Sequence, residues 1–194
     1  MSLFENRMAP MLAILALLQT GALAVMVVER WWLIKSGREI TLPIVPVDPR
    51  DLFRGEYVEL GYDIGRVPAR LLEGPPPPAN TAFYVTLEKS QDGTWQAVKL
   101  TREGPQEASS AERIVLKGRT RSGRRIADAN AANAVNFVRY GIERYFVAQG
   151  EGPKLEALAR DKKLAALIAI DGRGNAAIKG ILIDGRLAYA EPFL

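Results

Sequence analysis

The sequence predicts a mainly β, antiparallel domain with one late helix, preceded by a single N-terminal transmembrane helix. Two observations lead to this fold class. The run from Met8 to Val28 carries no charge, and as a helix it reaches about 30 Å, the thickness of a bilayer core. After this run, apolar and polar residues mostly alternate, and short turn sequences separate the alternating stretches, which is typical of antiparallel strands.

Composition narrows the possible chemistry. The 194 residues are 48% hydrophobic and 25% charged, which fits a folded protein and excludes a disordered or low-complexity chain. The sequence contains no cysteine and no histidine. It therefore cannot form disulfides, zinc fingers, thiol nucleophiles, or Ser-His and Cys-His catalytic pairs. A Ser-Lys dyad needs no histidine, but nothing in the sequence singles out one serine.

The predicted anchor has the flanks of a membrane-spanning helix. Charged and interfacial residues border it: Arg7 before it, and Glu29, Arg30, Trp31, Trp32 and Lys35 after it. Paired tryptophans beside a basic residue suit the membrane–water interface. We therefore expect a short tail over residues 1–7, an anchor helix with its interfacial flank over 8–35, and one β-rich domain over 36–194.

Two alternatives to an uncleaved anchor fit the sequence less well. A cleaved signal peptide would use Ala22 and Ala24 as its small-residue site, but the apolar run continues past them. A buried core helix would normally show a polar face, and this run has none. The orientation is a separate question. The basic residues Arg30, Lys35 and Arg38 outnumber those before the helix, so the positive-inside rule alone places the β-rich domain in the cytoplasm.

The first strands of the domain follow from alternation and from proline. Residues 39–47 alternate, but Pro43, Pro46 and Pro49 exclude both a helix and a central strand, so we expect an edge strand. Residues 56–64 alternate again. The proline-rich segment 74–78 predicts a long loop inside one domain. Residues 83–87 and 95–100 predict a hairpin around the Asp92-Gly93 turn.

The later elements are read in the same way. Residues 114–116 and 135–140 predict two further strands. Pro153 opens a helix that we expect to run through Lys163. Residues 164–170, 176–183 and 187–190 predict three final strands, with turns at residues 171–174 and at Asp184-Gly185.

The densest polar segment is the run from Asp48 to Tyr62. If residues 56–62 form a strand, Glu56, Val58, Leu60 and Tyr62 share one face, and Tyr57, Glu59 and Gly61 share the other. A buried Glu56 would need a partner such as Arg50, Arg54 or Arg139. A functional reading makes Asp48, Asp51 and Glu56 a site for a hard cation or an acid–base pair. Turn capping together with a buried ion pair is the structural alternative, and we favour it.

A second segment combines aromatic and charged residues between Arg139 and Glu151. Glu151 lies close to the predicted start of the late helix, where a carboxylate is favoured. This segment predicts either one wall of a binding cleft or a core strand whose aromatic side chains pack on the sheet.

Five basic residues cluster within residues 117–125: Lys117, Arg119, Arg121, Arg124 and Arg125. Nucleic-acid binding would call for exposed aromatic residues within the cluster, and none lies there. A solvated strand and hairpin tip is the preferred interpretation, and attraction to anionic lipid headgroups is a further one.

The residues Gly55-Glu56-Tyr57-Val58-Glu59-Leu60-Gly61-Tyr62 resemble the motif that names the GDYXXLXY protein family. Gly55, Tyr57, Leu60 and Tyr62 match, whereas Glu56 stands where the family name has Asp. The lead-in of residues 48–54 and a second block over residues 140–152 also resemble the family. The resemblance implies a bacterial, membrane-anchored protein of unknown function, often encoded beside polytopic membrane proteins. It therefore favours a domain outside the cytoplasm, at the inner membrane, against the charge count.

A weaker similarity concerns type I signal peptidases, which are also anchored β proteins with a proline-containing turn before a Gly-acid-Tyr-Val strand. Their nucleophilic serine precedes the proline, where this chain has Val47 and Asp48. The resemblance implies at most a related scaffold without that activity.

These observations together predict a binding or accessory subunit of a membrane-protein complex, with no cofactor, no metal and no nucleic-acid partner. The alternative is a hydrolase that uses carboxylates or a divalent cation on a signal-peptidase-like scaffold. The predicted binding surface consists of Asp48, Arg50, Asp51, Arg54, Gly55, Glu56, Tyr57, Leu60, Tyr62, Arg139, Tyr140, Gly141, Glu143, Tyr145 and Glu151.

Overall fold

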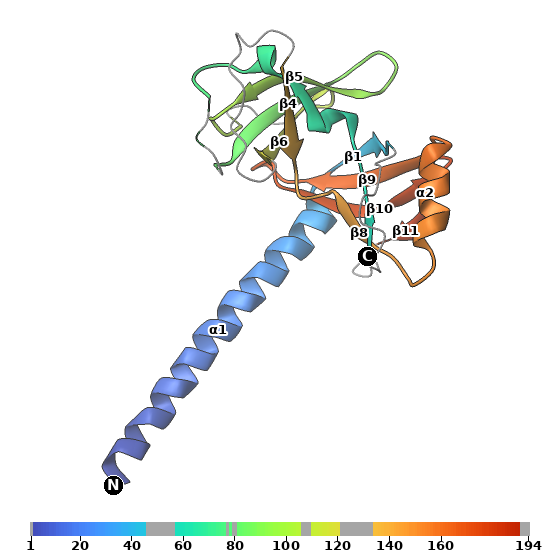
Figure 1. Cartoon of the computed structure of the whole chain (residues 1–194). Coiled ribbons are helices and arrows are strands. Elements are labelled where there is room, and N and C mark those ends of the chain that lie inside the picture. Colours follow the sequence, from blue (N-terminus) through green and yellow to red (C-terminus); the bar gives the residue numbers. More distant parts are fainter. Residues whose placement is uncertain are drawn as a thin grey trace.

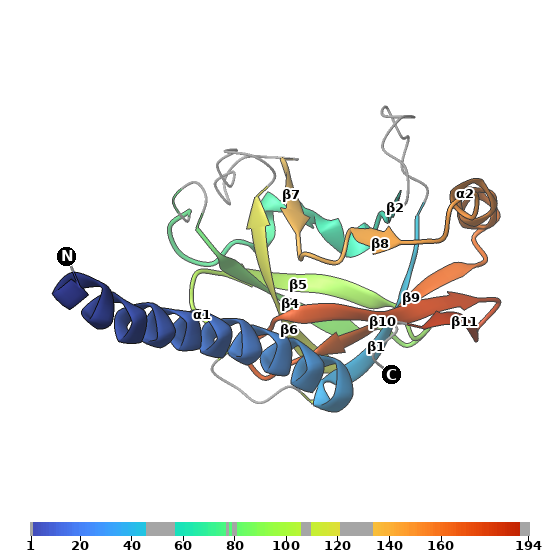
Figure 2. The same cartoon turned by 90° about the horizontal axis from the view of Figure 1, so that it is seen from below.

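A single long helix projects from a body built of β-sheets (Figure 1). The computed structural model describes residues 2–45, 57–76, 78, 81–105, 110–120 and 134–190. The view from below shows the C-terminal end of α1 beside β1 (Figure 2). The predicted fold class, an antiparallel β-rich domain with an N-terminal apolar helix and one short late helix, is confirmed.

Helix α1 (Ser2–Ser36) contains the apolar run. The segment Pro10–Ser36 is long and apolar enough to cross a membrane, and its most apolar stretch packs against nothing in the body. Leu17, for example, keeps 73% of its surface exposed. The last two turns differ, because Leu33 and Ile34 are buried in a small cluster with Ala177. The helix therefore has a bare section and a docked end.

Gly37 ends the helix and turns the chain into the first sheet. Its N–H donates to the Leu33 carbonyl oxygen at 2.9 Å. A Cβ at this position would collide with that oxygen and would lie 3.0 Å from the backbone nitrogen of Ile170. Only glycine allows the chain to pass this close to the neighbouring strand.

The first sheet has four strands in the order β1-β9-β10-β11, and all its pairings are antiparallel. They are β1 (Arg38–Pro43), β9 (Leu164–Ile170), β10 (Ala176–Ile183) and β11 (Arg186–Ala190). Strand β1 lies at an edge, as its prolines predict, and pairs Arg38 with Ile170 and Pro43 with Ala165. The turn between β10 and β11 has positive φ at both Asp184 and Gly185, the pattern that suits a two-residue hairpin.

The second sheet has five strands in the order β3-β7-β6-β4-β5. They are β3 (Arg66–Pro68), β7 (Val135–Arg139), β6 (Arg113–Thr120), β4 (Phe83–Lys89) and β5 (Trp95–Thr101). The predicted hairpin forms between β4 and β5, and the Asp92 carboxylate accepts the backbone N–H of Thr94 at 3.0 Å in its turn. Alternate residues of β4 and β6 are fully buried, so one face of this sheet lines the core.

A small two-stranded sheet and short helices complete the body. Strands β2 (Tyr57–Glu59) and β8 (Arg144–Phe146) pair, and the helices are η1 (Asp63–Gly65), η2 (Ala69–Leu71) and α2 (Gly152–Arg160). Residues from all three sheets belong to one continuous apolar core. Among the described residues, the part after the helix thus behaves as one packed unit.

Two predicted boundaries are wrong. The strand expected over residues 56–64 ends at Glu59, because Gly61 forms only an isolated bridge with Val45 and the chain then enters η1. The late helix ends at Arg160 rather than at Lys163. Lys162 takes a positive φ of 57° and donates its N–H to the Ala159 carbonyl, so the chain closes the helix without a glycine. The part of the basic cluster after Thr120 lies outside the described residues.

Candidate functional site

The motif segment and the second aromatic block, far apart in the sequence, form one unit. Strands β2 and β8 pair Tyr57 with Phe146, Val58 with Tyr145 and Glu59 with Arg144. The N–H of Leu60 extends the pairing by donating to the Glu143 carbonyl at 2.8 Å. The alternation predicted for this segment is confirmed, because Val58, Leu60 and Tyr62 are buried while Glu59 is exposed. The described residues of the two blocks therefore make a single candidate surface.

Two buried tyrosines fasten the blocks together by a reciprocal exchange of hydrogen bonds. The Tyr62 hydroxyl donates to the Ile142 carbonyl at 2.9 Å, and the Tyr140 hydroxyl donates to the Ile64 carbonyl at 2.7 Å. Each block thus supplies one hydroxyl and one carbonyl. Burial, and secondly the negative charge of Glu143, raise the pKa of both tyrosines far above the usual value, so both stay protonated donors.

Glu143 holds the turn that presents these groups. Its carboxylate accepts the backbone N–H of Tyr140 at 2.6 Å and that of Gly141 at 3.0 Å. Gly141 adopts a φ of +83°, which glycine tolerates best. The Glu143 side chain therefore caps a turn within the second block, and its lone pairs are largely committed there.

The solvent side of β2 and β8 carries Tyr57 from the predicted surface, together with Glu59, Arg144 and Phe146, which the predicted surface did not include. The predicted Leu60 and Tyr145 are buried in the core. The rings of Tyr57 and Phe146 meet edge to face with their centroids 6.1 Å apart, and the Arg144 guanidinium lies 5.3 Å from the Tyr57 ring centroid. Phe146 is 74% exposed, which is unusual for a large apolar side chain. Arg139 approaches the Glu59 carboxylate at 3.3 Å. We call this surface, formed by Tyr57, Glu59, Arg144 and Phe146, the β2–β8 outer face.

A cleft of about 600 Å³ lies beside the outer face, between the ends of β6, β7 and β8 and the turn before β10. Its charged lining consists of Lys117, Arg119, Arg139, Arg144, Glu59 and Glu143. The sequence placed Lys117 and Arg119 in a basic cluster but not in the site. The alternation along β6 turns both outward, and this was the available signal.

Glu151 lies at the start of α2, as predicted, but apart from this cleft. Its carboxylate accepts hydrogen bonds from Lys154 Nζ at 2.6 Å and from the Tyr189 hydroxyl at 2.7 Å. The hydrogen bond from Lys154, and to a smaller extent that from Tyr189, lowers the pKa of Glu151. The residue ties α2 to strand β11, and this contact is structural.

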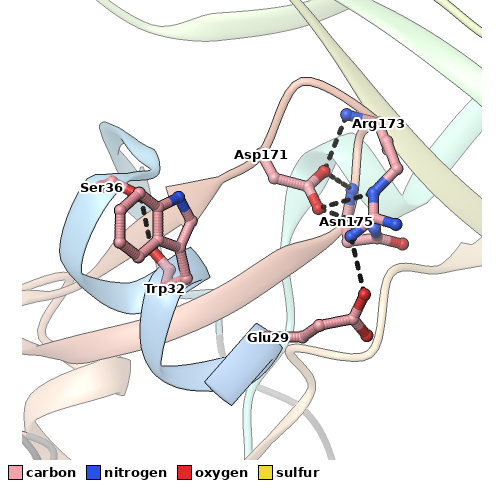
Figure 3. Close-up of polar contacts among 6 residues, drawn as sticks. All are labelled: Glu29, Trp32, Ser36, Asp171, Arg173 and Asn175. Atoms are coloured by element: carbon pink, nitrogen blue, oxygen red, sulfur yellow. Dashed lines mark hydrogen bonds and ion pairs between the residues drawn. The ribbon is translucent and has the colours of Figure 1, made fainter. Parts of the chain in front are cut away.

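A second cleft of about 680 Å³ lies where the end of α1 meets the turn between β9 and β10. Asp171 organises the turn, because its carboxylate accepts the backbone N–H groups of Arg173 and Asn175 at 2.9 and 2.8 Å (Figure 3). Arg173 reaches Glu29 of α1 at 3.4 Å. Within the helix, Ser36 donates to the Trp32 carbonyl at 2.7 Å. Of these contacts, the Arg173–Glu29 ion pair is the one that joins the helix to the domain.

Some predicted site residues cannot be placed. Asp48, Arg50, Asp51, Arg54, Gly55 and Glu56 lie outside the described residues. The described residues contain no group of three or more carboxylates that could hold a metal ion. The hydrolase alternative depends on Asp48, Asp51 and Glu56, so it stays a prediction.

Comparison with known proteins gives one match. A family model described as GDYXXLXY protein matches residues 19–181. No curated protein and no solved structure matches the chain. The match begins within the bare section of α1, covers both blocks and ends in β10, so the resemblance read from two short segments extends over most of the chain.

Proposed function

This chain belongs to the GDYXXLXY protein family, and from that premise we propose that it is a membrane-anchored binding or accessory subunit of a membrane-protein complex. In this proposal α1 spans the inner membrane, the β domain lies on the periplasmic side, and the β2–β8 outer face contacts a polytopic membrane protein.

The observation that carries the proposal is the docked end of α1. The helix runs without a break from its bare apolar section into the packed cluster of Leu33, Ile34 and Ala177. Arg173 on the domain meets Glu29 on the helix, and Arg30 donates to the Ala176 carbonyl at 3.4 Å. An anchor fastened in this way holds the domain at a fixed height and angle, which suits a subunit that must meet a neighbour in the same membrane.

The use of the motif residues also favours a binding role. The hydroxyl groups of Tyr62 and Tyr140 donate hydrogen bonds to backbone carbonyls in the interior, and the Glu143 carboxylate caps a turn. These groups stabilise the surface rather than face a substrate. What the two blocks present outward is an aromatic pair with charged neighbours, and aromatic and arginine side chains are enriched where proteins bind one another.

Site-specific crosslinking in intact cells tests the proposal. A photoreactive phenylalanine analogue replaces Phe146 in the full chain, which carries a C-terminal tag. The matched control places the analogue at Leu187, an exposed residue (51%) on β11. We expect a crosslinked product with an integral membrane protein from position 146 and none from position 187.

Protease treatment of spheroplasts reads the orientation in the same cells. An accessible tag is expected for a periplasmic domain, and a protected tag would support the charge count and overturn the orientation. Equal crosslinking from positions 146 and 187, or none from either, would contradict the assignment of the outer face as a partner surface.

A further inference from the structure

We propose that the cleft between β6, β7 and β8 binds a phosphate group through Arg119, Arg139 and Lys117. This site goes beyond the proposed function and does not depend on the direction in which α1 crosses a membrane. The phosphate group belongs either to a lipid headgroup or to a phosphorylated soluble compound, because both present negatively charged, non-bridging phosphate oxygens.

The register of β6 and β7 places two arginines opposite each other. These strands pair Arg119 directly with Arg139. Residues in register on antiparallel strands point to the same face with Cβ atoms about 5 Å apart, and like charges in that position repel. Lys117 lies two residues before Arg119 and therefore shares its face. The fold thus gathers three cationic side chains on one small patch.

The carboxylates that line the cleft do not balance the positive charge of these side chains. The lining contains four cationic side chains and two carboxylates, which gives a net charge of +2. Glu59 contacts Arg139 at 3.3 Å and is also the register partner of Arg144. Glu143 is committed to two backbone N–H groups. Within the described part of the chain, Lys117 and Arg119 make no ion pair.

A phosphate group suits such a site. Its oxygens accept several hydrogen bonds at once, and the guanidinium fork of arginine matches them in pairs. A dianion between Arg119 and Arg139 would turn their mutual repulsion into shared attraction. The cleft volume of about 600 Å³ admits a phosphate and a substantial part of the molecule that carries it.

The cleft lies where either a lipid headgroup or a soluble phosphorylated compound could reach it. Ala176 lines the cleft, and its carbonyl accepts a hydrogen bond from Arg30 near the end of α1. The cleft therefore borders the part of the domain that is nearest the helix, where a headgroup could reach it, and it is also open to solvent.

The experiment compares thermal unfolding of the full chain and of Arg119→Gln in micelles of a maltoside detergent, which contains no phosphate. In a low-salt buffer without phosphate, we expect Arg119→Gln to unfold about 1–3 °C higher than the wild type, since the substitution removes a like-charge pair. With 10 mM inorganic phosphate, the wild type should gain at least about 3 °C and the order should reverse. Lys117→Gln should weaken the response to phosphate as a second variant.

Two controls distinguish specific phosphate binding from the screening of charges by salt and from a change in the net charge of the protein. Arg186→Gln removes an exposed arginine on β11, outside the cleft. It should leave the response to phosphate unchanged. Sodium chloride at matched ionic strength should not reproduce the gain. Equal responses of the wild type and Arg119→Gln to phosphate, or a gain with chloride as large as with phosphate, would overturn the proposal.

A final arm identifies the source of the phosphate. Maltoside micelles that contain phosphatidylglycerol, without free phosphate, should raise the unfolding temperature of the wild type but not of Arg119→Gln if the ligand is a headgroup. If only free phosphate has this effect, the ligand is a soluble phosphorylated compound. This readout needs no partner protein, so its failure would leave the proposed complex untouched, and failure of crosslinking would leave this site untouched.

Discussion

Replacing Tyr62 by phenylalanine tests whether the motif is a structural fastening. The substitution keeps the ring in the core and removes only the hydroxyl that donates to the Ile142 carbonyl at 2.9 Å. The carbonyl loses this partner in a place where the tyrosine itself is only 7% exposed. Water cannot easily replace the lost donor there, so the cost should exceed that of a surface hydrogen bond.

The expected magnitude follows from the burial of the pair. Leaving a buried acceptor unsatisfied costs about 1–3 kcal/mol. A protein of this size loses about 2–4 °C in unfolding temperature for each kcal/mol, so a loss of about 2 kcal/mol lowers the temperature by about 4–8 °C. Tyr140→Phe removes the reciprocal bond to Ile64 and should have an effect of similar size.

The assay must report on the domain and not on the helix. The fluorescence of Trp95, which is buried in the core, follows domain unfolding, whereas Trp31 and Trp32 on α1 give a background that membrane mimics hold constant. Tyr57→Phe is the matched control, because Tyr57 belongs to the same motif and makes only ring contacts among the described residues. It should change the unfolding temperature by less than about 1 °C.

One result would refute this reasoning. If Tyr62→Phe and Tyr57→Phe unfold at the same temperature while a binding function is lost only in Tyr62→Phe, the Tyr62 hydroxyl serves a ligand and not the interior. The reciprocal bonds would then not be what holds the two blocks together.

Two further predictions concern pH and the C-terminal end of α1. Burial raises the pKa of Tyr62 and Tyr140, so above the ordinary value of 10.0 the unfolded chain releases protons that the folded chain keeps. The free energy of unfolding is therefore fully retained below pH 10 and should fall above it by about 1.4 kcal/mol per pH unit for each tyrosine. Urea unfolding between pH 9 and pH 11.5 measures this slope, and the double phenylalanine variant should flatten it. Gly37→Ala should destabilise the domain by about 1–3 kcal/mol, because the added Cβ collides with the Leu33 carbonyl oxygen. Gly21→Ala meets no atom within 4 Å and should leave the unfolding temperature unchanged, so equal effects of the two substitutions would contradict a tight helix junction.

The local sequence predicted the strands of this fold where the alternation of apolar and polar side chains agreed with the positions of proline and glycine. The prolines of residues 39–47 predicted an edge strand, and β1 is one. The face shared by Val58, Leu60 and Tyr62 was also correct. Lys162, by contrast, adopts a positive φ that a non-glycine residue rarely shows, so no residue type in this segment indicated that the helix ends at Arg160.

Long-range pairing could not be predicted, and most of the site depends on it. The second block could be read either as a core strand or as a cleft wall, and the structure makes it both: Tyr145 is buried while Arg144 lines the cleft. Arg139 was one of three arginines expected as a partner for Glu56, which lies outside the described residues; among the described residues, Arg139 contacts Glu59. The opposition of Arg119 and Arg139 depends on the register between β6 and β7, which no local pattern determines.

The pairing of β1 with β9 has a consequence for biogenesis. Strand β1 follows the helix directly, yet Arg38 finds its partner only at Ile170, near the other end of the chain. Such a high contact order makes the first sheet slow to form. During translation, Ile40 and Leu42, which are buried in the finished protein, stay uncovered until β9 has been synthesised. A chain truncated before Leu164 would therefore keep α1 but expose an apolar strand beside it, which chaperones and proteases would recognise.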